Sequence, residues 1–413
     1  MVGNQSRGCW LRPETVCDLV VAVNAGSSDA LAEKMLSALE AVVPQPGGGL
    51  HEPLFRGNEK RYLEECVDSG YVSSVGEFVG RFETELANFV GAPHALAVVN
   101  GTSGLHLALV GLGVGPGDEV IVPALSFVAT ASAVALVGAV PHFVDVSYDS
   151  WGVGADELRN YLESLLELKA GKATNKITGR PVTAIVFMHT LGFPADARGL
   201  VGVARNFGLV CVEDAAESLG SWADESHTGL AGDAGVFSFN GNKTVTTGGG
   251  GAVVTRDPGL AHRLRHLSTT AKVPHRYEFD HDELGFNYRM PNINAALGLA
   301  QLEQLPLLIA KQRQLHEMYV EALNDLSLGV MKSESDGATS NYWLQAFVLD
   351  PNFAARRNVF LDKFLDAGMP VRPMWRPLNG LAPYQHSPSA PTPVTEDLYS
   401  RVLCLPSSAR LAA

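Results

Sequence analysis

Hydrophobic residues recur along the chain in short unbroken runs, separated by stretches in which they follow helical spacing. The runs are typical of buried strands, and they predict strands at Ala95–Val99, Glu119–Val122, His142–Val146, Ala184–Met188, Leu209–Glu213, Gly235–Phe239 and Gly251–Thr255. The helical spacing predicts helices at Glu59–Val67, Phe78–Val90, Thr102–Leu112, Val128–Val137 and Ala197–Phe207. Strands that alternate with helices indicate an α/β fold with a mostly parallel central sheet flanked by helices.

An N-terminal leader and a smaller C-terminal domain bound this alternation. We predict a leader over residues 1–50, with one helical pattern at Ala30–Val43 and a Pro- and Gly-rich linker at its end. Residues 51–305 form the predicted large domain. Residues 306–413 form a smaller α+β domain, entered through two long helical patterns. Within it we expect a strand and a helix, at Trp343–Leu349 and Ala354–Ala367.

Composition and charge exclude several classes of protein. The 413 residues carry a net charge of −13, which disfavours a nucleic-acid-binding role, because such proteins neutralise phosphates with clustered cations. The apolar stretch Val120–Val146 is interrupted by Pro123 and Pro141, so it does not predict a membrane span. The five cysteines are scattered without metal-ligand spacing. We therefore expect reduced thiols, no metal site and a cytoplasmic location.

Two segments that follow strands could hold a phosphorylated aromatic ligand. Asn100–Gly104 opens a predicted helix, where the hydroxyls of Thr102 and Ser103 and the free backbone amides can bind a phosphate. Phe127 lies just beyond the next strand and could stack on a flat heteroaromatic ring. Taken alone, each segment is at least as typical of a structural turn or of a core phenylalanine.

Two further segments supply a carboxylate and an amine. Asp214 ends an apolar strand and could keep a pyridine nitrogen protonated, although a helix-capping carboxylate would look the same. Lys243 lies in a polar, Gly-rich segment between two short strands, and Ser238 precedes it by five residues. A partly buried lysine can form a Schiff base with an aldehyde cofactor. Together, the segments predict a pyridoxal-phosphate site.

The order of these segments resembles that of a known family. The chain contains NGTS, PALSF, EDAAES and FSFNGNK, followed by TTGGGG, in that order. This resembles the DegT/DnrJ/EryC1/StrS sugar aminotransferases, which are fold-type-I pyridoxal-phosphate enzymes. The resemblance extends from Pro53 to Ser408.

The resemblance implies a role for each matching residue. Lys243 would form the internal aldimine and then move the proton during amino transfer. Asp214 would pair with the pyridinium nitrogen and Phe127 would stack on the ring. The phosphate would be bound by Thr102, Ser103 and Ser238. Asn287, in the segment GFNYR, would reach the phosphate of a neighbouring subunit and so implies a homodimer with shared active sites.

The sequence departs from the family pattern at two places. Glu217 stands where many members have a glutamine that contacts the phenolic oxygen of the cofactor. A carboxylate facing a phenolate repels it unless a proton or a cation intervenes, so the role of Glu217 is left open. The sequence also stops five residues after Ser408, where relatives commonly continue into a terminal helix. We therefore expect a small domain that is shortened or differently closed.

The residues of these motifs also suggest a substrate. They resemble the motifs of the branch that acts on UDP-linked 4-keto-6-deoxy-N-acetylhexosamines. Enzymes of that branch use glutamate as the amino donor and pass through a pyridoxamine-phosphate intermediate. The diphosphate would need cations, and the candidates are Arg289, Arg56, Lys60 and Arg372. Each such residue is more often a solvated surface charge.

Three alternatives stay open at the level of sequence. A sugar dehydratase of the same family would replace the Schiff-base lysine, and Lys243 argues against it. Another fold-type-I enzyme, such as an amino-acid aminotransferase or a cysteine desulfurase, would use the same cofactor, but no cysteine stands in a convincing catalytic loop. A non-catalytic regulator that binds the cofactor would carry a helix-turn-helix or a basic arm, and neither is apparent.

Overall fold

The computed structural model of the protein describes residues 29–44 and 47–412. The predicted leader before residue 29, Gln45 and Pro46 of the predicted linker and the last residue, Ala413, lie outside the described residues. Two of the cysteines, Cys9 and Cys17, are also outside them.

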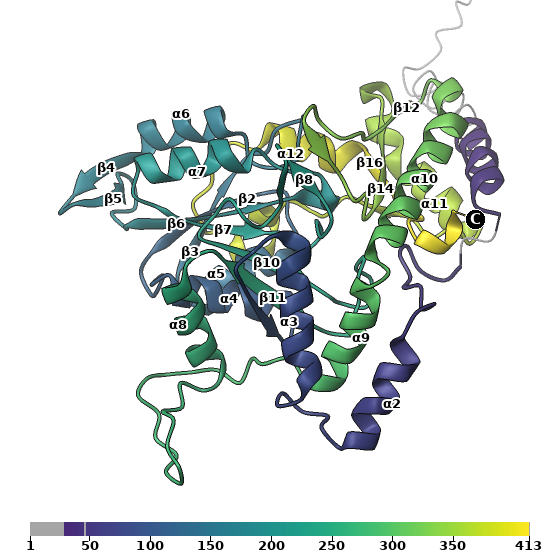
Figure 1. Ribbon diagram of the computed structural model, residues 1–413. Helices are drawn as coiled ribbons and strands as arrows, with labels where there is room; N and C mark the ends of the chain where they lie inside the picture. Colours follow the sequence, from purple (N-terminus) through teal and green to yellow (C-terminus); the bar gives the residue numbers. More distant parts are fainter. Residues whose placement is uncertain (1–28, 45–46, 413) are drawn as a thin grey trace, which may run out of the picture.

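A seven-stranded sheet forms the centre of the large domain (Figure 1). Its order is β1 (His94–Val98), β11 (Gly251–Thr255), β10 (Ala234–Ser238), β7 (Val210–Asp214), β6 (Val182–Met188), β2 (Glu119–Pro123) and β3 (Val140–Val144). The strands from β10 to β3 are parallel, and β11 runs antiparallel between β1 and β10. The prediction of a mostly parallel sheet is confirmed.

Helices cover both faces of the sheet, because its strands alternate their buried side chains between two cores. Along β7, for example, Val212 packs with α4 (Gly101–Gly111), α5 (Val128–Leu136) and α8 (Pro258–Ser268). Cys211 instead packs with α6 (Ala155–Leu165) and α7 (Ala197–Asn206). The β1 and β11 end of that second face is covered by α3 (Glu77–Val90) and α9 (Asn292–Leu302), and α2 (Glu59–Ser69) packs on α9.

The small domain follows α10 (Leu305–Leu323) and is built on a four-stranded antiparallel sheet. The order is β12 (Gly329–Met331), β14 (Gln345–Leu349), β16 (Val402–Leu405) and β15 (Arg372–Pro373). Helices α11 (Arg357–Asp366) and α12 (Pro393–Arg401) complete it. The strand β14 starts later than predicted because Tyr342 turns the backbone with φ +47°. The predicted helix starts later as well, because Pro351–Arg356 is a 3-10 helix.

The helix predicted within the leader packs against this small domain. Residues 29–42 are helical, and Met35 and Leu39 are fully buried in a core shared with Leu315, Phe360 and Leu403. On its outer side, Glu33 forms an ion pair with Lys363 of α11. This part of the predicted leader therefore forms one packing unit with the small domain.

Several elements were not predicted from the sequence. These are α6, α8, α12, the strands β12, β15 and β16, the hairpin β4 (Leu166–Lys169) with β5 (Lys172–Asn175), and the small sheet of β8 (Trp222–Ala223), β9 (Ser226–His227) and β13 (Ala338–Thr339). For α8 a signal existed, since Asp257 caps the helix and Pro258 occupies its first position.

Among the described residues, no single helix is long and apolar enough to cross a membrane. The bent pair α9 and α10 passes the same test of length and composition only when its two helices are taken together.

Candidate active site

The carboxyl ends of the parallel strands meet the small domain at a cavity of about 280 Å³. Open α/β sheets bind their ligands at this edge. Of the residues predicted from the sequence, the structure brings seven to the wall of this cavity, namely Thr102, Phe127, Asp214, Glu217, Ser238, Lys243 and Arg372.

One end of the cavity is the start of helix α4. Asn100 caps this helix by accepting a hydrogen bond from the backbone N–H of Ser103 at 2.8 Å, so that amide is already used. The strand β11 passes so close that a Cβ on Gly251 would lie 2.6 Å from the carbonyl carbon of Asn100. Gly101 similarly approaches Ser238 at the end of β10. Thr102 and Ser238 therefore frame a helix N-terminus, an arrangement that suits a phosphate. Ser103 is not part of the cavity wall.

Asp214, the last residue of β7, is almost completely buried at the inner wall. One carboxylate oxygen accepts a hydrogen bond from the hydroxyl of Thr130 at 2.7 Å, and the other accepts one from the N–H of Ala216 at 3.2 Å. Burial raises the pKa of Asp214, and the hydrogen bond from Thr130 opposes this. A buried carboxylate calls for a cationic partner, and a protonated ring nitrogen would be such a partner.

Lys243 and Glu217 form an ion pair inside the cavity. The Nζ of Lys243 lies 3.1 Å from Oε1 of Glu217, and the two side chains are 12% and 1% exposed. The same Nζ lies 3.8 Å from the centre of the Trp343 ring, a cation–π contact. The indole N–H of Trp343 donates to the carbonyl of Asn242 at 2.7 Å, which fixes the ring beside the lysine.

Phe127 lies at the start of α5 and is half exposed, at 49%. Its ring centre is 6.4 Å from that of Trp375 in the small domain. A ring that is partly open to a cavity can stack on a bound heteroaromatic ligand.

The small domain contributes a cation. Arg372, on β15, lines the cavity. Burial raises the pKa of Glu217, and the positive charges of Lys243 and Arg372 oppose this rise. Among the described residues, the Nε of Arg372 is buried without a hydrogen-bond partner, and so is the indole N–H of Trp375. Both residues belong to the wall of the same cavity, so a ligand with acceptor atoms would have two donors there.

The sequence reasoning missed the two tryptophans of this site, Trp343 and Trp375. They come from the small domain, where no motif marks them. It also left Glu213 without a role of its own. Because side chains alternate along β7, Glu213 points away from the cavity and accepts hydrogen bonds from the N–H groups of Gly229, Ala231 and Gly232 and from His189. Its function is to fix the loop before β10.

Five of the predicted residues do not line the cavity, and Ser103 is one of them. Arg289 lies at β1, where its guanidinium forms an ion pair with Glu83 at 2.8 Å and donates to the carbonyl of Ala97. Arg56 and Lys60 are exposed next to α2. Asn287 is also exposed, on a segment that pairs with Thr269 after α8.

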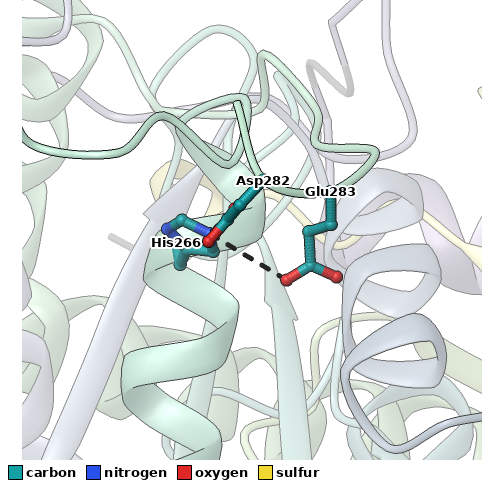
Figure 2. A group of neighbouring side chains, drawn as sticks. All are labelled: His266, Asp282 and Glu283. Carbon is teal, nitrogen blue, oxygen red and sulfur yellow. Dashed lines mark hydrogen bonds and ion pairs between the residues drawn. The ribbon is translucent and has the colours of Figure 1, made fainter. Parts of the chain in front are cut away.

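One group of side chains in the described residues has the spacing of metal ligands. His266 at the end of α8, Asp282 and Glu283 are drawn in Figure 2, and their ligand atoms lie within 4.8 Å of one another. His266 hydrogen-bonds Asp282 at 2.7 Å, and Arg263 binds both oxygens of Glu283. These pairs tie the long loop that projects after α8 back to the helix (Figure 1).

The donors and acceptors of the cavity fit pyridoxal phosphate. It offers an amine for the aldehyde, a buried carboxylate for the ring nitrogen, an aromatic ring for stacking, and a helix N-terminus with two hydroxyls for the phosphate. Within this cavity Glu217 faces Lys243, so the cation beside its carboxylate is Lys243.

Comparison with known proteins leads to the same family. A model of the DegT/DnrJ/EryC1/StrS aminotransferase family matches residues 54–413. The GDP-perosamine synthase of Escherichia coli O157:H7 is 36% identical over 358 residues, which cover 87% of this chain and 92% of that protein. The enzyme of the same name from Caulobacter vibrioides is 38% identical over 362 residues, with 87% and 92% covered.

A solved structure agrees with these matches. A DegT DnrJ EryC1 StrS aminotransferase from Brucella abortus superposes with a TM-score of 0.77 at 30% identity, over 85% of this chain and 90% of that one. The chain therefore belongs to the DegT/DnrJ/EryC1/StrS family and is an aminotransferase that depends on pyridoxal phosphate.

Proposed function

We propose that the enzyme transfers an amino group from glutamate to the C4 ketone of a nucleotide-linked 4-keto-6-deoxy sugar, and that Lys243 is the residue that holds the cofactor. The observation that carries this proposal is the shared cavity of Lys243, Asp214 and Thr102 at the carboxyl edge of the sheet. The amine, the acid and the helix N-terminus stand there in the arrangement that amino transfer requires.

Each residue has a defined task in this proposal. Bound pyridoxal phosphate supplies an electron sink for the negative charge that develops on the reacting carbon. Asp214 keeps the proton on the ring nitrogen, and Thr102 and Ser238 hold the phosphate. Lys243 removes the proton from the carbon that carries the amine and delivers it at the end of the transfer.

Arg372 suits the amino donor better than the diphosphate of the acceptor. Arg372 lines the same cavity as Glu217 and Lys243, so it lies near the reacting nitrogen. The carboxylate of an amino acid is two bonds from its nitrogen, whereas a sugar ring separates the C4 nitrogen from a diphosphate at C1. We therefore assign Arg372 and the indole N–H of Trp375 to the carboxylate of glutamate.

Two sugars are candidates for the acceptor. Three relatives at 35–38% identity are named GDP-perosamine synthase, which supports a GDP-linked sugar as the first candidate. The motif that contains Glu217 resembles that of the branch that uses UDP-linked N-acetylhexosamines. A UDP-linked 4-keto-6-deoxy-N-acetylhexosamine is therefore the second candidate. We also propose a cytoplasmic homodimer in which Asn287 completes the partner's site. The three described cysteines, Cys66, Cys211 and Cys404, are buried free thiols, as in reducing compartments.

The test is an assay of the purified holoenzyme with glutamate and both ketosugars, with products identified by mass. We expect a sugar whose mass has changed by the exchange of a ketone for an amine, with one sugar converted faster. The variant Lys243→Ala should form no such product and should hold no cofactor that borohydride can reduce onto the chain. If wild-type enzyme aminates neither sugar, the proposal is wrong.

A further inference from the structure

We propose that Glu217 is the counterion of the Lys243 nitrogen, both in the free lysine and once that nitrogen is linked to the cofactor, and that it keeps this nitrogen protonated. The inference rests on the proposed function, because it requires Lys243 to be the residue that carries the cofactor. It assigns a role to the position where this chain departs from its family, and the role follows from contacts of the carboxylate that can be stated atom by atom.

Both oxygens of the Glu217 carboxylate are held in place. Oε1 lies 3.1 Å from the Nζ of Lys243, and Oε2 accepts the backbone N–H of Leu191 at 2.9 Å. The backbone of Glu217 is fixed as well, because its carbonyl accepts a hydrogen bond from the side chain of Asn341 at 2.9 Å. A side chain that is 1% exposed, with both carboxylate oxygens and its own backbone carbonyl bound, cannot turn away from the lysine.

The neighbours of this carboxylate explain why the residue is an acid and not an amide. The Lys243 ammonium and the Leu191 N–H are both hydrogen-bond donors. A carboxylate presents an acceptor to each of them, whereas a glutamine would present one acceptor and one NH₂ group. With glutamine, a donor would face a donor, either at Leu191 or at Lys243.

The backbone of Leu191 shows that this geometry is enforced. Leu191 has φ +55°, a left-handed conformation that is unfavourable for a residue other than glycine. Its side chain is completely buried, so the surrounding core holds the backbone in that state. The strained N–H points at Glu217, as expected where packing preserves an unusual backbone for the sake of a site.

The other ionisable groups around the pair do not replace Glu217. Asp214 lies at the end of β7 and, in the proposed function, serves the ring nitrogen. Arg372 on β15 is a further cation that acts on Glu217, and Cys404 on β16 and His51 before α2 are the remaining ionisable neighbours. Among these groups, Glu217 is the carboxylate in direct contact with the Lys243 nitrogen.

A negative charge at hydrogen-bond distance favours the protonated form of a nitrogen. In the proposed arrangement the proton stays on the Lys243 nitrogen and Glu217 is a carboxylate, because the Lys243 charge and the Leu191 N–H oppose the burial that raises the pKa of Glu217. No other group then has to supply or accept a proton. A protonated nitrogen withdraws electrons from the carbon bonded to it, and this carbon is then more open to attack by the incoming amine. The consequence is a cofactor that remains reactive toward amines at higher pH than without Glu217.

The test is a pH titration of the visible absorbance of the holoenzyme, without substrate. We compare wild type with Glu217→Gln and with Glu119→Gln as the matched control, since Glu119 is also a fully buried carboxylate but lies at the start of β2, the opposite end of the strand from the cavity. The midpoint of this absorbance titration should fall by about one pH unit or more in Glu217→Gln, which is a tenfold or larger change in the protonation constant of the Lys243 nitrogen. In Glu119→Gln it should not move.

An unchanged midpoint in folded Glu217→Gln that holds its cofactor would overturn the inference. If this variant does not fold or hold the cofactor, the titration is made on Glu217→Ala with and without acetate. Acetate should raise the midpoint where chloride at equal ionic strength does not, and no effect of acetate would equally overturn the inference. Borohydride reduction of wild type, followed by mass analysis of the Lys243 peptide, distinguishes a failure of this inference from a failure of the proposed function. A cofactor on another residue would overturn the proposed function itself.

Discussion

At the scale of single residues, the site depends on polar groups whose partners differ in kind. Asp214 and Glu217 are both buried carboxylates, yet one is bound by neutral donors and the other by an ammonium group. Arg372 is the counterpart, a cation with a buried N–H that finds no partner in the described protein. A buried N–H donor without a partner favours the binding of a ligand that supplies the missing acceptor.

Replacement of Arg372 by methionine should separate the two halves of the reaction. Without the guanidinium, conversion of the holoenzyme by glutamate should slow by about tenfold to a hundredfold, because a charge-assisted hydrogen bond is lost. Stopped-flow absorbance measures this step without any sugar. Amination of the ketosugar by enzyme that already carries the amine should keep its rate, and Arg198→Met, on the surface of α7, should change neither step. Equal slowing of both steps would refute the assignment to the donor.

At the scale of elements, the site is assembled where strand and helix ends come into contact. Strand β11 reaches the turn before α4 because Gly251 has no side chain, and the contact brings Thr102 beside Ser238. This contact explains why Gly251, the last residue of the TTGGGG segment, is a glycine. Close approach of two backbones is a common reason for glycine at a binding site.

The variant Gly251→Ala should weaken cofactor binding by about 1–3 kcal/mol, because its Cβ would overlap Asn100 and displace the start of α4. Gly249→Ala is the matched control two residues earlier, since a Cβ there meets nothing within 4 Å. Titration of each apoenzyme with pyridoxal phosphate compares the two affinities. Equal affinities would show that the turn does not depend on this contact.

The helix over residues 29–42 offers a second prediction at this scale. Leu39 is fully buried between α10, α11 and the small sheet, so Leu39→Ala should lower the free energy of unfolding by about 2–5 kcal/mol. Glu40→Ala, on the exposed side of the same helix, should change it by less than about 0.5 kcal/mol. Thermal or denaturant unfolding checks both variants, and an unaffected Leu39→Ala would mean that the helix does not support the small domain.

The sequence predicted more of the large domain than of the rest. Strand and helix ends that carry the site were found because apolar runs there are unbroken, and the motifs lie directly after them. The small domain was harder, since strands as short as β15 have no periodicity of their own. For the same reason, nothing in the sequence indicated that Trp343 and Trp375 reach the cavity, because tertiary packing brings them there.

At the scale of the whole molecule, the proposed homodimer would cover part of the exposed surface. Tyr71 and Val75, before α3, and Leu284, before Asn287, are large apolar residues exposed by 63%, 79% and 82%. Asn287 itself is exposed and contributes nothing to the cavity of its own chain.

A mixture of two inactive variants tests the shared site. Lys243→Ala and Asn287→Glu, coexpressed, should form heterodimers in which one of the two sites is intact, so activity should return to about a quarter of wild type. The control pair is Lys243→Ala with Asp214→Asn, whose residues line the same cavity of one chain and should restore nothing. If the first pair also stays inactive, Asn287 does not serve the partner's site.

The helix over residues 29–42 also has a consequence for how the protein is made. It leaves the ribosome among the first described segments, yet it packs on Leu403 and Leu405, which are synthesised about 360 residues later. At a synthesis rate of about 5–20 residues per second, the apolar face of the helix remains without this packing partner for roughly 20–70 seconds. The large domain can fold during this interval, whereas the small domain cannot close until β16 has been synthesised. Nascent chains that are arrested before β16 should therefore expose this helix to chaperones and proteases.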